Sequence, residues 1–457
     1  MKRIYKQTLS VEQLLSKQNI DKTKKYRKFF YLTDCPVDDG LLILNTVTYE
    51  FLFLSNEEIA LLKEPDLNNA TVQYLIEQYF LVPEDFDDKK FAIQVTDTRI
   101  QIQDVFTNPP LTSFTILPTT GCNARCFYCF EQGAKVSNMT EQTAHDVADF
   151  IERKGTKNVT IRWFGGEPLV NIKAIDTISK DLKAKNIRFS SHMVSNGYLL
   201  DEEAVKKAVE IWNLKKIQIT LDGTEEVYNK VKNYVYKDVS SPFLRVLDNI
   251  ENAIKAGIQV NIRLNMDEHN AEDLFKLSEM LVKRYNKYRN CAIYVMRLYE
   301  STCSEIMNRN VTDRHKLIED SVKLQKYVND NMQNPIVGEL PKFFPTPSSC
   351  MATSDSSVMI VPDGHLGKCE HFVDNDFYGS IYSDEIDFEK IKRYKQRTTV
   401  VPECDDCELR ALCIHAKCCE SFTSRCDEVY KKAIKARYDS KFLNIYNKFL
   451  ETEAKKQ

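Results

Sequence analysis

The 457-residue sequence contains no long apolar run and no excess of charge of one sign. A membrane-spanning helix needs about 20 consecutive apolar residues, so we expect no membrane association. The 63 Lys and Arg residues nearly balance the 66 Asp and Glu residues, and the formal net charge is −3. Because a nucleic-acid backbone is held by a strongly basic surface, we also expect no nucleic-acid partner.

The sequence also lacks the uninterrupted apolar segment of a secretion signal, because its start, MKRIYKQTLSVEQLLSKQNI, alternates polar and apolar residues. We therefore expect a cytoplasmic protein. Thiols stay reduced in the cytosol, so disulfides explain the fourteen cysteines poorly. Three of them lie within 122–129 and eight within 350–426, whereas Cys35, Cys291 and Cys303 stand apart. Such clustering predicts metal binding.

Residues 1–105 are predicted to form a small α+β module of winged-helix size. The segment LLILNTVTYEFLFLS (41–55) is rich in Val, Thr, Tyr and Phe and predicts two strands about a turn. Ser55 is a candidate N-cap for a short helix, and apolar residues at helical spacing predict a second helix over 70–80. Residues 81–91 are predicted to form a loop.

Residues 106–310 alternate short apolar runs with amphipathic segments, which is typical of parallel strands joined by helices. The predicted strands cover 114–118, 158–164, 187–194, 216–222, 258–265 and 292–298. Six β/α units are too few for a closed eight-stranded barrel. We therefore predict the α/β class, with an open, partial (β/α)6 TIM-like barrel that binds ligands at the carboxyl ends of its strands.

The rest of the chain is predicted to contain three further parts. Residues 311–345 are predicted to be a helical linker, and residues 346–430 a compact cysteine-rich domain with few helix signals. Residues 431–457 carry a terminal helix, whose amphipathic pattern starts at about 429.

The stretch GCNARCFYCF at 121–130 places Cys122, Cys126 and Cys129 directly after the first predicted strand. A structural zinc site normally has four protein ligands, and disulfides need an even number of cysteines. Three thiolates from one loop can instead bind three irons of a four-iron, four-sulfur cluster and leave the fourth iron open to chelate a small molecule. The Cys-x3-Cys-x2-Cys spacing, with Tyr128 before the last cysteine, resembles the radical S-adenosylmethionine (SAM) enzymes. Zinc or a purely structural role is the alternative.

The turn after the second predicted strand fits the same resemblance. Gly165-Gly166-Glu167-Pro168 resembles the family's GGEP motif, which holds the amino group of SAM. Two glycines allow the backbone to approach a ligand closely, and Glu167 is expected to pair with the ammonium group. An ordinary loop is the alternative.

Polar residues also lie at the ends of the next three predicted strands. Ser195 and Asn196 close the third and Asp222 closes the fourth, where a ribose or a carboxylate could be bound. Arg263 and Asn265 lie two apart in the fifth strand and so share one face. Arg263 is the candidate partner of the SAM carboxylate. Ordinary turn or surface polarity is the alternative for each of these residues.

A second group of cysteines begins on a predicted hairpin. Cys350 and Cys369 flank Pro362-Asp363-Gly364, a turn signal, so both can face one site. Further cysteines follow at Cys404, Cys407, Cys413, Cys418, Cys419 and Cys426. The arrangement resembles the SPASM domain, which carries two auxiliary four-iron clusters in a subset of radical SAM enzymes.

That resemblance implies a ligand set for each auxiliary cluster. The outer cluster would be held by Cys404, Cys407, Cys413 and Cys426, and the inner one by Cys350, Cys369 and either Cys418 or Cys419. The family usually has three residues between the third and fourth cysteines of this run, where this chain has Lys417 in the fourth position. The choice between the two adjacent cysteines therefore stays open, as does an open iron on the inner cluster. A zinc ribbon would explain Cys404 and Cys407 alone.

The resemblance implies three [4Fe-4S] clusters, one of which binds SAM, and a flavodoxin- or ferredoxin-type electron donor. A reduced cluster would cleave SAM to a 5′-deoxyadenosyl radical, which takes a hydrogen atom from the substrate. The N-terminal module resembles the leading segment of maturases that act on ribosomally made precursor peptides, and an edge strand there could pair with a leader peptide. We expect the enzyme to install a thioether or carbon–carbon crosslink. The alternatives are an anaerobic sulfatase-type maturase that makes formylglycine, a peptide epimerase, and a non-catalytic electron carrier or zinc scaffold.

Overall fold

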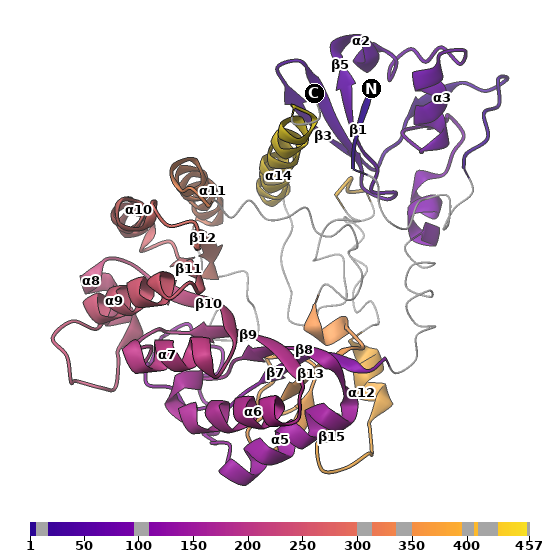
Figure 1. Ribbon diagram of the computed structural model, residues 1–457. Helices are drawn as coiled ribbons and strands as arrows, with labels where there is room; N and C mark the ends of the chain where they lie inside the picture. Colours follow the sequence, from indigo (N-terminus) through magenta and orange to yellow (C-terminus); the bar gives the residue numbers. More distant parts are fainter. Residues whose placement is uncertain are drawn as a thin grey trace.

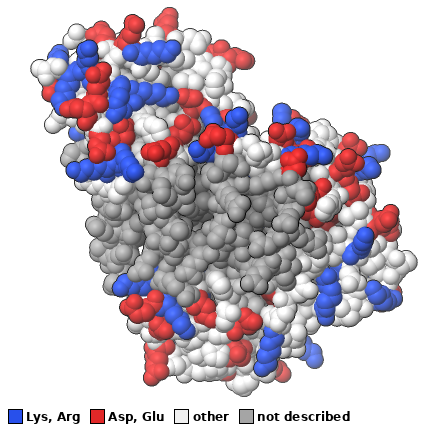
Figure 2. All heavy atoms as spheres, turned by 180° about the vertical axis from the view of Figure 1, so that it is seen from behind, with Lys and Arg blue, Asp and Glu red and all other residues white. Residues whose placement is uncertain are grey.

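The computed structural model describes residues 1–5, 17–95, 109–298, 313–334, 350–394, 406–409 and 428–454 (Figure 1). A large parallel sheet covered by helices occupies the middle of the chain, and a smaller antiparallel sheet lies near both termini. No helix among the described residues is long and apolar enough to cross a bilayer. Acidic and basic side chains are interspersed over the described part of the face in Figure 2.

The six predicted strands of the central region are present and pair in parallel in chain order. They are β7 (Leu111–Ile116), β8 (Gly155–Trp163), β9 (Arg188–Ser195), β10 (Leu214–Leu221), β11 (Gln259–Met266) and β12 (Cys291–Arg297). The helices between them are α5 (Glu141–Lys154), the short η1 (Pro168–Asn171), α6 (Ile172–Ala184), α7 (Glu202–Glu210), α8 (Glu225–Lys232), α9 (Pro242–Lys255) and α10 (Ala271–Tyr285). The predicted α/β partial barrel is confirmed.

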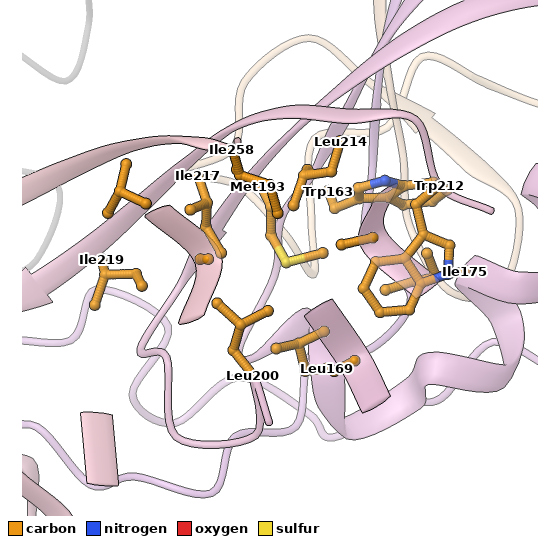
Figure 3. Close-up of a cluster of buried hydrophobic side chains, with 14 of the residues drawn as sticks. Trp163, Leu169, Ile175, Met193, Leu200, Trp212, Leu214, Ile217, Ile219 and Ile258 are labelled. Carbon is orange, nitrogen blue, oxygen red and sulfur yellow. The ribbon is translucent and has the colours of Figure 1, made fainter. Parts of the chain in front are cut away.

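The two faces of this sheet differ in polarity. In β8, Ile161 and Trp163 are fully buried, whereas Arg162 between them is only half-buried. Figure 3 shows Trp163, Met193 and other strand residues packed against apolar side chains from the helices and loops that follow the strands. Burying each large aliphatic side chain contributes about 1.5–3 kcal/mol, so the helix-covered face holds the barrel together. The opposite, inner face is left for polar side chains.

Helix α11 (Arg314–Asn331) lies in the segment predicted to be a linker, but it packs on the barrel. The Gln325 side chain accepts a 2.8 Å hydrogen bond from Val295 N of β12, and Arg297 donates to the Ser321 hydroxyl over 2.8 Å. This helix therefore completes the sixth β/α unit. Most of the predicted linker after it lies outside the described residues.

The hairpin predicted around Gly364 is present and has an unexpected neighbour. Strands β13 (Ser357–Ile360) and β14 (His365–Gly367) are antiparallel, and β15 (Gly379–Ser380) follows them. Strand β13 pairs in parallel with β7, so this part of the cysteine-rich segment extends the barrel sheet to nine strands. The short helices η5 (Met351–Thr353) and α12 (Phe388–Arg393) lie on either side of the hairpin in the sequence.

The N-terminal region contains a four-stranded antiparallel sheet and, among its described residues, three helices. The sheet order is β1 (Lys2–Tyr5), β5 (Phe51–Ser55), β4 (Gly40–Asn45) and β3 (Leu32–Val37), and the first two helices are α2 (Asn56–Ala60) and α3 (Ala70–Glu77). The predicted strand pair, the Ser55 cap and the second helix are confirmed. The loop predicted at 81–91 is wrong at both ends. Buried Leu81 and Val82 form β6 (Leu81–Pro83), which pairs with β2 (Tyr26–Lys28), and residues 88–95 are helical. Likeness to a winged helix stays a prediction.

The predicted terminal helix is present as α14 (Glu428–Ala454), and it packs on the N-terminal sheet. The Phe442 ring centre lies 4.9 Å from that of Phe51, and Tyr446 stacks on Phe53 at 5.2 Å. The two ends of the described chain therefore meet (Figure 1). Helix spacing predicted an apolar face on this helix, but not what it would cover.

Candidate functional site

The cysteine loop follows β7 at the carboxyl end of the parallel sheet. Cys122, Cys126 and Cys129 are all half-buried, and none is in a disulfide. Burial and then the charge of Glu167 raise the pKa of Cys122 to about 12, and the other two cysteines add to this effect. Burial raises the pKa of Cys129 to about 11, with a smaller contribution from Cys126. The pKa values of Cys122 and Cys129 respond to the neighbouring cysteines, which indicates that the fold brings the three thiols to one site.

The donors of this site fit an iron–sulfur cluster better than a single ion. Among the described residues, no three His, Cys, Asp or Glu side chains are placed to hold one metal ion. A zinc site needs its ligands about 2.0–2.3 Å from one atom, whereas iron–sulfur clusters are held by cysteine thiolates on separate irons. Two buried polar atoms beside the loop, Asn123 Nδ2 and Asp222 Oδ1, have no hydrogen-bond partner among the described residues. A ligand that offers an acceptor and a donor would satisfy both.

The glycine pair after β8 packs against the cysteine loop. A Cβ atom on Gly166 would lie 2.4 Å from the Gly121 carbonyl oxygen, and Gly165 has a φ of +111°. Gly166 N donates to Thr119 O over 3.3 Å, and Glu167 N donates to Gly121 O over 2.9 Å. The glycines were predicted to allow close approach to a ligand. They also allow close approach to the backbone of the cysteine loop, and their approach to a ligand stays a prediction.

Glu167 is fully buried and joins the ends of two strands. Its Oε1 atom accepts hydrogen bonds from Leu169 N at 3.1 Å and from the Ser195 hydroxyl at 2.9 Å, and Oε2 accepts from Asn196 N at 2.7 Å. Pro168 begins η1 directly after it, where a missing N–H is harmless. Three protein donors therefore surround the carboxylate that was predicted to bind an ammonium group, and that pairing stays a prediction.

Glu167 should make stability depend on pH. Burial raises its pKa from the ordinary 4.5 to about 6, despite the hydrogen bonds from Asn196 and Leu169. The folded state therefore binds this proton more tightly than the unfolded chain, so the stabilising contribution is present below about pH 4.5 and is lost as the pH rises through about 6. Glu167→Gln removes the titration. We expect the unfolding free energy of the native chain, relative to this variant, to fall by about 2 kcal/mol between pH 4.5 and 7. Urea denaturation at several pH values tests this, and a pH-independent difference would contradict it.

Ser195 and Asn196 were predicted to bind a ribose or a carboxylate, and the structure shows them in a protein network. Besides its contact with Glu167, Asn196 donates through Nδ2 to Asn123 Oδ1 over 2.7 Å. This bond ties the end of β9 to the cysteine loop. The three loops after β7, β8 and β9 are thus one hydrogen-bonded assembly. Contacts of these side chains with SAM stay predictions.

Lys232 is a residue of this site that the sequence reasoning missed. Its Nζ atom lies 2.9 Å from Asp222 Oδ2, and the two side chains are 3% and 1% exposed. Nζ also donates to the Tyr128 hydroxyl over 3.0 Å. A lysine near the end of an amphipathic helix normally indicates a solvated position. Its four-residue spacing from buried Tyr228 could have placed it on the inward face of α8.

The polar inner face of the barrel contains the remaining predicted contacts. Arg263 donates to Asn265 Oδ1 over 2.8 Å, so the prediction that they share one face is confirmed. Arg162, which the sequence reasoning did not single out, donates through both terminal nitrogens to Glu370 at 2.8 and 3.1 Å. Glu370 follows Cys369, so this ion pair joins β8 to the cysteine-rich segment.

The two described cysteines beside the hairpin lie together. Cys350 and Cys369 belong to one small cluster with Ala352 and Tyr394, which agrees with the prediction that they face one site. Cys407 lies elsewhere, in the apolar cluster that includes Phe442 of α14 and the N-terminal sheet. The other predicted ligands lie outside the described residues: Cys404, Cys413, Cys418, Cys419 and Cys426.

Residues 116–281 match the family model of the Radical SAM superfamily. A protein named probable GTP 3′,8-cyclase from Saccharolobus islandicus is 24% identical over 303 residues, which cover 62% of this chain and 92% of that protein. A protein of the same name from Methanocaldococcus jannaschii is 31% identical over 150 residues, which cover 32% of this chain and 46% of that protein.

Two solved structures share the fold. Native anSMEcpe with bound AdoMet has a TM-score of 0.58 and 19% identity, and the match covers 75% of this chain and 100% of that chain. Streptococcus suis SuiB bound to the precursor peptide SuiA has a TM-score of 0.52 and 14% identity, with 89% of this chain and 99% of that chain covered. At identities this low, the structural match shows a common fold only.

Proposed function

We propose that this chain, whose residues 116–281 form a radical SAM domain, is an enzyme that installs a thioether or carbon–carbon crosslink in a ribosomally made precursor peptide. The domain implies an enzyme that uses a [4Fe-4S] cluster and SAM, which when bound supply the one-electron chemistry for removing a hydrogen atom from the substrate. Cys122, Cys126 and Cys129 would hold that cluster. We further propose that the remaining predicted cysteines hold two auxiliary clusters, which makes three in all.

The extent of the fold carries this proposal. SuiB, whose structure contains a precursor peptide, matches 89% of this chain, which is far more than the radical SAM domain alone. The GTP 3′,8-cyclase relative covers 62%. The match reaches parts of the chain outside residues 116–281, and these are parts that a peptide-bound enzyme of the same fold can account for. They support a peptide substrate.

The chain's own residues would bind, orient and shield. Arg263 would pair with the SAM carboxylate. The unpartnered atoms of Asn123 and Asp222 would form hydrogen bonds with the same ligand. The Arg162–Glu370 pair holds the segment after Cys369 against the barrel. That contact covers the inner face beside β8 and would help exclude water from the substrate. A flavodoxin- or ferredoxin-type protein would supply electrons.

A GTP cyclase is the second candidate function, because the curated relatives carry that name at 24% identity. Anaerobic reconstitution followed by separate incubations with GTP and with the peptide encoded beside the gene decides between them. We expect about twelve irons, four for each of three clusters. We also expect a peptide that has lost the mass of two hydrogen atoms, and unchanged GTP. Fragmentation must then locate the new bond, since formylglycine made from serine gives the same loss. Consumption of GTP with intact peptide would overturn the proposal.

A leader peptide would pair with one edge of the N-terminal sheet, and the two edges of this sheet differ. On β3, Pro36 has no N–H to donate, and the Asp34 carbonyl already accepts from Lys435 of α14. The edge of β1 (Lys2–Tyr5) carries no such block among the described residues. We expect the leader peptide to slow hydrogen exchange of β1 amides in the full chain. Unchanged exchange throughout residues 1–95 would leave this module without a leader site.

A further inference from the structure

Lys232 places a charge where lysine seldom lies. Its side chain is 3% exposed, although the ammonium group of lysine normally reaches water. Nζ lies 5.6 Å from the centre of the Tyr128 ring and 5.7 Å from that of Tyr228, in addition to its contacts with Asp222 and the Tyr128 hydroxyl. Burial alone would lower the pKa of Lys232, but Asp222 and the other neighbours raise it well above its usual value. The group is therefore a fixed positive charge.

This charge lies beside the cysteine loop. The backbone carbonyl of Lys232 accepts a 2.8 Å hydrogen bond from Arg125 N, which fastens the end of α8 next to Cys126. The Tyr128 hydroxyl, which accepts a hydrogen bond from Lys232 Nζ, belongs to the same loop and lies between Cys126 and Cys129 in the sequence.

We propose that Lys232 is a positioning residue whose charge, acting directly and through the Tyr128 hydroxyl, stabilises the reduced form of a cluster bound through Cys126. Reduction transfers one electron from a low-potential donor to the cluster and adds one negative charge to it. Hydrogen bonds to the sulfurs and burial set the potential of such a cluster, and charges interact more strongly in a dry site than in water. The inference rests on the proposed function only in that Cys126 is a cluster ligand.

The test is an EPR-monitored redox titration of the reconstituted full chain, which follows the cluster signal that responds to SAM. Lys232→Met is compared with Lys230→Met, which removes the same charge from an exposed position on the same helix. We expect the equilibrium constant for one-electron reduction of the cluster to fall at least tenfold in Lys232→Met. This corresponds to a midpoint potential at least about 59 mV lower. The Lys230→Met midpoint should match the native one. An unchanged midpoint in Lys232→Met with full iron content would overturn the proposal.

Two further variants keep the test decisive if Lys232→Met does not hold iron. Replacing both members of a buried ion pair is often tolerated, so Lys232→Met with Asp222→Asn should fold. We expect a smaller fall in midpoint there than in Lys232→Met, because the opposing negative charge of Asp222 is removed as well. Tyr128→Phe removes only the hydroxyl, and we expect a smaller fall. Native-like midpoints in these variants would contradict the proposal. Failure of the native chain to assemble a SAM-responsive cluster would instead contradict the proposed function.

Discussion

Cys126→Ala is expected to abolish SAM cleavage and to lower the iron content of the reconstituted chain by about four atoms. With one thiolate missing, the loop retains two of its three cluster ligands. The carboxylates of the site are not expected to replace it, because iron–sulfur clusters are held by cysteine thiolates and Glu167 is already held by three protein donors. Iron analysis and assay of 5′-deoxyadenosine measure the two effects.

Cys291→Ala is the matched control for that experiment. Cys291 is fully buried at the start of β12, in the barrel core and outside the cysteine loop. Its substitution should lower stability modestly and leave iron content and SAM cleavage unchanged. If Cys126→Ala kept the full iron content, this loop would not be the place where a cluster binds.

Gly166→Ala is expected to have the next largest effect, although it changes no ligand. The added Cβ would lie 2.4 Å from Gly121 O and 2.6 Å from Thr120 O, and backbone atoms can yield only if the cysteine loop moves. Overpacking of this kind costs about 1–3 kcal/mol, and movement of the loop should disrupt the site before the barrel unfolds. We expect loss of about four irons in a variant whose circular dichroism spectrum stays native.

Gly133→Ala separates close contact from backbone strain. Gly133 follows the same cysteine loop and has a φ of +92°, but a Cβ there would meet no atom within 4 Å. Its substitution should cost about 1 kcal/mol through strain and leave iron binding intact. Equal iron loss in both variants would mean that the tight packing at Gly166 is not what holds the loop.

Sequence patterns predicted the barrel well because its strands carry apolar residues at alternate positions, which are buried on the helix-covered face. They failed where pairing depends on distant residues. Strand β6 exists because Leu81 and Val82 meet β2, and β13 extends the barrel only because it reaches β7. Neither contact leaves a local signal in the sequence.

In the site, too, local sequence patterns predicted some features, and those that depend on distant contacts were missed. The cysteine spacing predicted which residues would gather, and the structure brings Cys122, Cys126 and Cys129 together. The roles of neighbouring residues were harder to predict, because they depend on which loops touch. Gly166 packs on the cysteine loop, and Lys232 is buried only because Asp222 and Tyr128 surround it.

The central claim is that the three-cysteine loop holds a cluster with an iron available to SAM. The EPR spectrum of the reduced chain, recorded with and without SAM, tests it most directly. We expect a cluster signal that changes when SAM is added and that is absent from Cys126→Ala. A signal that ignores SAM, or zinc in place of iron at these thiolates, would contradict it.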